Sequence, residues 1–131
     1  DSLQEAPAPS PDAKPTLLKT ASGMRFRILK EGKGRTPREG QKVSTDYDGW
    51  VQGFNKGPKF DSSVDAGEKF RFLAGVGEVI PGWDEAVLAM REGETRQIIL
   101  PPHLAYGKRG SPPDIPPNAT LYFQLTLHKC L

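Results

Sequence analysis

The chain has 131 residues, 26% of them charged, and its 18 basic and 16 acidic residues leave a net charge of +2. This size fits one compact domain with some additional tail. Both signs of charge are mixed along the sequence, which argues against a nucleic-acid-binding face, and no apolar run approaches the roughly 18 residues of a membrane helix. A single cysteine, Cys130, excludes an internal disulfide and a cysteine zinc site.

The first 19 residues are expected to form a tail. Pro7, Pro9, Pro11 and Pro15 stand among alanine, serine and acidic residues, and such a segment buries too little apolar surface to offset its ordering entropy. We therefore expect a disordered proline-rich tail over residues 1–19 and one folded domain over residues 20–131. The tail composition fits an inert linker and equally a ligand for a proline-recognising partner domain.

Strands are predicted wherever apolar and polar residues alternate. Met24, Phe26 and Ile28 alternate with Arg25 and Arg27, which is the pattern of a half-buried strand. The same reasoning predicts strands at residues 43–51, around Phe70 and Phe72, at 95–100, and at 121–128. Segments rich in glycine and proline, at residues 32–40, 53–59 and 103–118, are expected to be loops and turns.

One segment has the pattern of an amphipathic helix. Trp83, Ala86, Val87 and Met90 fall at helical spacing on one face, and Gly93 provides a stop. Five or six strands joined by hairpin-like loops favour an antiparallel sheet, and a single helix is then needed to cover its apolar face. The predicted fold class is therefore α+β.

Five segments resemble one protein family, in order and in spacing. They are Tyr47-Asp48-Gly49, Lys59-Phe60-Asp61-Ser62-Ser63, Gly77 to Asp84, Leu104-Ala105-Tyr106-Gly107 and Ile115 to Leu121. Together they are similar to the tacrolimus-binding immunophilins, the FKBP-type peptidyl-prolyl cis/trans isomerases, over about Thr20 to Leu131. The resemblance implies a strongly twisted antiparallel sheet wrapped around one short helix, with the active pocket between them. It also implies rotation of X-Pro peptide bonds in protein substrates.

The resemblance assigns roles to ten residues. Catalytic roles are implied for Asp61, Tyr106, Ile80 (through its backbone N–H) and Tyr47. Contacts with the proline, and with tacrolimus- or rapamycin-like macrolide inhibitors, are implied for Phe60, Phe70, Val79, Trp83, Ile115 and Phe123. Because amide rotation breaks no bond, neither a cofactor nor a metal ion is expected.

Some aromatic and acidic residues have a simpler structural interpretation. Aromatic side chains in alternating strands are usually core, and we expect this of Phe26 and Phe72. Trp83 alone would also be core, and Asp61 before two serines would be a turn or cap. Only the surrounding motif favours a functional role for Trp83 and Asp61.

Three positions depart from the family pattern. Ala66 stands where many members carry an arginine that pairs with the active-site aspartate, and Ser111 and Asp114 replace residues of the loop over the pocket. These differences support an alternative function, a weakly active or inactive proline-binding scaffold that uses the same pocket. We expect a monomer. The segment from Gly75 to Ile80 resembles chloroplast-lumen members, so the thylakoid lumen is the expected compartment, with the cytoplasm as the alternative.

Overall fold

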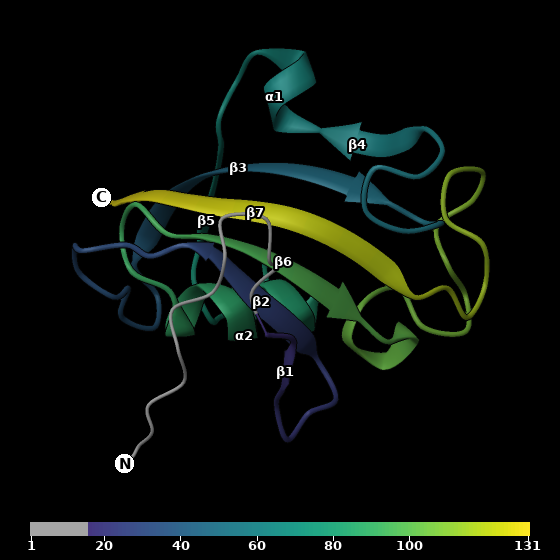
Figure 1. Ribbon diagram of the computed structural model, residues 1–131, viewed down its shortest axis with the longest axis horizontal. Coiled ribbons are helices and arrows are strands. Elements are labelled where there is room, and N and C mark those ends of the chain that lie inside the picture. Colours follow the sequence, from purple (N-terminus) through teal and green to yellow (C-terminus); the bar gives the residue numbers. More distant parts are fainter. Residues whose placement is uncertain (1–15) are drawn as a thin grey trace.

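The computed structural model describes residues 16–131, so most of the predicted tail falls outside the described residues (Figure 1). Two helices, α1 (Ser63–Ala66) and α2 (Pro81–Ala89), and one 3₁₀ turn, η1 (Pro102–Leu104), accompany the strands. The strands are β1 (Leu18–Lys19), β2 (Arg25–Lys30), β3 (Lys42–Trp50), β4 (Lys59–Ser62), β5 (Phe70–Leu73), β6 (Thr95–Leu100) and β7 (Leu121–Cys130). No helix within residues 16–131 is long and apolar enough to cross a membrane.

The strands of the described residues form one antiparallel sheet in the order β1-β2-β6-β7-β3-β4, with β5 also paired to β3. Along its length β3 pairs with β7 on one side. Its other side is shared, because β5 pairs with Lys42 to Thr45 and β4 pairs with Asp48 to Trp50. This edge of β3 is therefore interrupted at Asp46 and Tyr47.

The α+β prediction is confirmed, and most strands lie within one or two residues of their predicted bounds. The clearest case is β7, where alternate residues from Leu121 to Leu127 are buried and those between them are partly exposed. Strands β1 and β4 and the short helix α1 were not predicted. Leu18 and Lys19, expected in the tail, pair with β2 as β1, which brings the strands within residues 16–131 to seven. Both are exposed, so no burial pattern marks them in the sequence.

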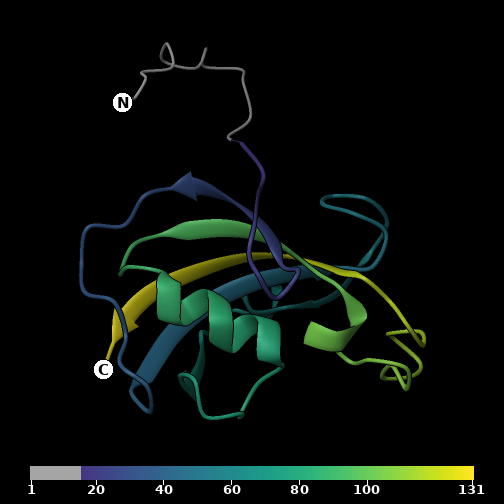
Figure 2. The same cartoon turned by 90° about the horizontal axis from the view of Figure 1, so that it is seen from below.

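Helix α2 lies against one face of the curved sheet (Figure 2). It buries Trp83, Ala86 and Val87, and Met90 at its C-cap is buried as well, so all four residues predicted to face the core do so. Gly82 makes the close approach possible, because a Cβ there would lie 2.4 Å from a methyl carbon of Leu100 on β6. The helix thus needs a glycine at this position to reach the sheet.

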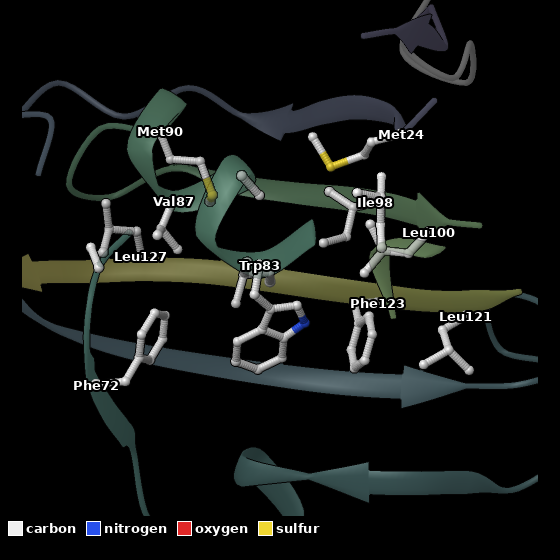
Figure 3. Close-up of a cluster of buried hydrophobic side chains, with 14 of the residues drawn as sticks. Met24, Phe72, Trp83, Val87, Met90, Ile98, Leu100, Leu121, Phe123 and Leu127 are labelled. Atoms are coloured by element: carbon white, nitrogen blue, oxygen red, sulfur yellow. The ribbon is translucent and has the colours of Figure 1, made fainter. Parts of the chain in front are cut away.

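The main core lies between α2 and the sheet (Figure 3). Side chains from the helix meet those of the strands that it covers, so close packing fixes the helix on the sheet. The labelled members are Met24, Phe72, Trp83, Val87, Met90, Ile98, Leu100, Leu121, Phe123 and Leu127.

A buried ion pair closes the far end of α2. Arg96 pairs with Glu94, and both side chains are less than a tenth exposed. Arg96 also donates to the carbonyl of Ala89 at 3.0 Å and lies 4.5 Å from the ring centroid of Phe26. A cation is favourable at a helix C-terminus, so the pair fixes the helix end against β2 and β6.

Candidate functional site

A cavity of about 450 Å³ opens between the start of α2 and the β3, β4 and β5 strands. We call it the aromatic pocket. Most of its wall is aromatic or aliphatic, and the polar groups are few. Its lining residues are Tyr47, Phe60, Asp61, Phe70, Glu78, Val79, Ile80, Trp83, Tyr106 and Phe123.

Trp83 is the centre of the aromatic wall. Its ring centroid lies 4.7 Å from that of Tyr47, 5.2 Å from Phe123 and 5.8 Å from Phe70, each in an edge-to-face arrangement. Such contacts add about 0.5–1.5 kcal/mol per pair beyond area burial. Trp83 is 4% exposed, so its position is fixed by the surrounding rings.

Gly49 of β3 leaves room for two rings of the pocket wall, those of Phe60 and Phe123. A Cβ at Gly49 would lie 2.7 Å from Cζ of Phe60 and 2.9 Å from Cε1 of Phe123. These two rings contact each other edge to face at 5.5 Å. The absence of a side chain on β3 therefore lets both rings approach the strand.

Asp61 is one of two carboxylates that line the pocket, the other being Glu78. Its carboxylate accepts a 2.6 Å hydrogen bond from the Tyr47 hydroxyl and a 2.9 Å bond from the backbone N–H of Ser62. Burial, then the hydrogen bond to Asp61 and the charge of Asp61, raises the pKa of Tyr47. The Tyr47 hydroxyl thus stays protonated and serves as a donor that orients the carboxylate.

Two further donors line the pocket without an internal partner. Ile80 is the extended N-cap of α2, and its N–H donates no hydrogen bond within residues 16–131. The Tyr106 hydroxyl likewise has no hydrogen-bond partner within residues 16–131, and Tyr106 is 40% exposed. Burial and the charge of Asp61 raise the pKa of Tyr106, which keeps this hydroxyl a donor as well.

Nine of the ten sequence-predicted site residues line this one cavity; their individual roles remain predictions. Ile115 differs, because it is 4% exposed and belongs to the core cluster. It forms a β-bridge with Ser111, which closes the loop of residues 103–118 on itself, and its side chain anchors this loop to the core. Phe72, expected to be core, is buried there, and Phe26 packs against the core.

Glu78 lines the pocket but was missed by sequence reasoning. Its carboxylate accepts a 2.9 Å hydrogen bond from the backbone N–H of Leu73, which fixes the chain just before Ile80. Its place directly before the Val79-Ile80 pair was a usable signal. The family resemblance implied no role for this position.

The departures from the family pattern also have structural consequences. A second cavity of about 410 Å³ adjoins the aromatic pocket, sharing Tyr47, Asp61 and Phe70, and Ala66 is among its lining residues. Within residues 16–131 no cationic nitrogen lies within 4.0 Å of Asp61. Asp61 is therefore held by neutral donors. The same part of the chain contains no group of three side chains that could hold a metal ion.

The chain was compared with known proteins. The family model described as FKBP-type peptidyl-prolyl cis-trans isomerase matches residues 33–128. "FK506-binding protein 1" of Gibberella zeae is 45% identical over 109 residues, covering 82% of this chain and 97% of that protein. "Peptidyl-prolyl cis-trans isomerase FKBP4" of Mus musculus is 46% identical over 127 residues, which is 95% of this chain but only 26% of the mouse protein. The chain thus spans about a quarter of that longer relative.

Solved structures give the same result. The crystal structure of AtFKBP13 is 33% identical with a TM-score of 0.81, covering 88% of this chain and 99% of that one. FkpA from Escherichia coli is 34% identical with a TM-score of 0.77, over 86% of this chain and 50% of that one. The family match over residues 33–128, the curated relatives and the aromatic pocket agree: the chain belongs to the FKBP-type peptidyl-prolyl cis-trans isomerase family.

Proposed function

We propose that the aromatic pocket binds the proline ring of an X-Pro segment and lowers the barrier to rotation of the preceding amide bond. That barrier is about 18–20 kcal/mol, so uncatalysed exchange takes roughly 10–100 s. The twisted amide has lost resonance and part of its charge separation. A water-poor aromatic wall therefore disfavours the planar amide more than the twisted one, which is differential stabilisation of the transition state.

Each polar group has a role in this proposal. Trp83 is the floor beneath the proline ring. The Ile80 N–H and the Tyr106 hydroxyl donate to the substrate carbonyls that flank the proline. Asp61, oriented by Tyr47, directs its charge toward the rotating amide. The observation that supports the assignment is the convergence, on one apolar cavity, of two donors without internal partners and one oriented carboxylate.

The test is NMR exchange spectroscopy of a short X-Pro peptide with a catalytic amount of the protein. Acceleration is expected for the native chain, with reduced acceleration for Asp61→Asn and Trp83→Leu. Glu31→Gln, an exposed carboxylate outside the pocket lining, is the matched control and is expected to behave as the native chain. Acceleration that both site variants leave unchanged would refute the assigned roles.

A non-catalytic proline-binding module is the second candidate. The observation favouring it is the open cavity beside Ala66 and the lack of a cation at Asp61. This candidate predicts saturable binding of X-Pro peptides with no exchange enhancement, across several residues before the proline and in a folded sample.

We further propose that a tacrolimus- or rapamycin-like macrolide competes with peptide for the pocket, because its lining matches the residues assigned by the family resemblance. Competition is measured by displacement of a labelled X-Pro peptide. We also propose that the chain is a monomer, which sedimentation velocity tests. The thylakoid lumen, with the cytoplasm as alternative, stays a prediction from the Gly75 to Ile80 segment, and imaging of the full-length natural protein tests it.

A further inference from the structure

We propose that the face of the sheet opposite the pocket positions Asp61 and Tyr47 through two serine-to-aspartate hydrogen bonds. Ser62 and Ser63 make these bonds with Asp48 and Asp46, and these four residues are called the serine clamp. The proposal rests on the proposed function, since it concerns how the same site is held. The clamp residues are positioning residues, because they act through Asp61 and Tyr47.

The two faces of β3 place the clamp behind the site. Tyr47 faces α2, where its ring contacts Trp83. Successive residues of a strand point to opposite faces, so Asp46 and Asp48 face away from the pocket. Asp46 accordingly contacts His128, which lies on the partly exposed face of β7.

Ser63 connects Asp46 to the backbone of the site. Its hydroxyl donates to the Asp46 carboxylate at 2.6 Å and accepts a 2.8 Å hydrogen bond from the backbone N–H of Tyr47. That N–H lies at the interruption in the edge of β3, where neither β4 nor β5 supplies a partner. Ser63 therefore replaces the missing strand and fixes the backbone that carries the Tyr47 ring.

Ser62 does the same for the strand that carries Asp61. Its hydroxyl donates to Asp48 at 2.5 Å and accepts at 3.0 Å from the backbone N–H of Asp65, as the N-cap of α1. Its own backbone N–H donates to the Asp61 carboxylate. The rotation of the Asp61 carboxylate thus depends on how the corner between β4 and α1 is tied to β3.

His128 and Lys59 contact the two clamp aspartates. His128 contacts Asp46 at 2.8 Å. Lys59 lies 3.2 Å from Asp48 and 3.1 Å from Asp65, so it joins β3 to α1. Burial raises the pKa of Asp46, but hydrogen bonds from Ser63 and His128, with the charges of His128 and Lys69, outweigh burial and hold it below the ordinary value. Asp46 is thereby kept as an acceptor for the Ser63 hydroxyl.

The clamp matters because, within residues 16–131, Asp61 is held only by the Tyr47 hydroxyl and the Ser62 N–H, and the clamp fixes both of these donors. The cavity beside Ala66 borders both Asp61 and Tyr47, and no cation of the described residues pairs with Asp61. A hydroxyl that loses its aspartate can rotate, and the N–H groups it accepts from lose a fixed partner. The predicted result is a misdirected carboxylate in an intact aromatic pocket.

The test uses exchange kinetics of the full chain with Ser63→Ala, Asp46→Ala and Asp46→Asn. Ser63→Ala and Asp46→Ala are expected to lower kcat by about three- to tenfold, the effect of one hydrogen bond, with KM changed less than about twofold. Asp46→Asn keeps an acceptor and should recover most of the activity. Thr95→Val, which removes the 2.9 Å Thr95–Thr126 bond from the same face, is the matched control and should leave kcat unchanged.

Epistasis decides between positioning and general destabilisation. In an Asp61→Ala background, Ser63→Ala should cost less than about twofold, because the carboxylate that it positions is gone. Equal losses in both backgrounds would overturn the proposal. The side-chain carboxyl carbon resonance of Asp61 gives a readout independent of activity. This resonance should shift in Ser63→Ala and not in Thr95→Val. If the native chain shows no catalysis, the proposed function fails, but the resonance still tests the clamp. A resonance that does not shift in Ser63→Ala would refute the clamp.

Discussion

Replacing Gly49 by alanine should change the pocket more than the stability of the fold. The new Cβ would overlap Phe60 at 2.7 Å and Phe123 at 2.9 Å, and overpacking of this kind typically costs about 1–3 kcal/mol. Removing a glycine from a strand returns about 0.5–1 kcal/mol. Phe123 is 2% exposed and cannot move, whereas Phe60 is only partly buried and can swing into the cavity. We therefore expect a net loss of about 0–2.5 kcal/mol in the free energy of unfolding, a few degrees in Tm.

The functional effect should be larger, because Phe60 would move into the space for the proline ring. Peptide titration by NMR should show affinity reduced by about tenfold, and exchange spectroscopy a matching fall in kcat/KM. The double variant Gly49→Ala/Phe60→Leu removes the overlapping ring atoms. Its loss in unfolding free energy should therefore be smaller than the sum of the losses of the two single variants. Unchanged peptide affinity in Gly49→Ala, or strictly additive stabilities, would show that the rings accept the methyl group without moving.

Three further outcomes test the surroundings of the site. Arg96→Met should cost about 3–5 kcal/mol in denaturant unfolding, because it leaves Glu94 buried without its partner; a cost below 1 kcal/mol would contradict this. The pKa of Asp46 is lowered on folding, so its charge stabilises the fold above about pH 4, and this stabilisation is lost as the pH falls through the lowered pKa. The difference in unfolding free energy between the native chain and Asp46→Asn should therefore be large at pH 7 and small at pH 3. A difference that does not change with pH would refute this. Burial and the charge of Glu92 raise the pKa of Cys130, so a thiol reagent should react slowly at pH 8 until denaturant is added, and immediate reaction would be the contrary result.

The parts of the fold that are readable in the sequence are those where periodicity and burial coincide. The strict alternation from Leu121 to Leu127 and the helical spacing of Trp83, Ala86 and Val87 correspond to β7 and α2. Strand β1 could not be predicted, because two exposed residues that pair with β2 carry no burial signal. The residues of the pocket came from motif resemblance, since periodicity alone would have placed Trp83 in the core, where it also lies.

Three features of the structure depend on how distant segments fold together and not on residue type alone. Ile115 has the right motif context, but its bridge to Ser111 turns it into the core, and this depends on how the long loop folds back. Glu78 acts through a hydrogen bond to a backbone N–H, and such partners are not encoded by residue type. The Arg96–Glu94 pair reads as surface charge in the sequence and becomes buried only because α2 ends above it.

The divided edge of β3 bears on how such a site can diversify. Residues 64–69, which follow the clamp serines, leave the sheet between β4 and β5 and return without interrupting the pairing of β3 with β7. Substitutions and changes of length in this excursion can therefore accumulate while the core remains the same. They would alter the surroundings of Asp61 on one side only, leaving the floor of the pocket untouched. A lineage could in this way change its preference for the residues beside the proline without having to evolve a new scaffold.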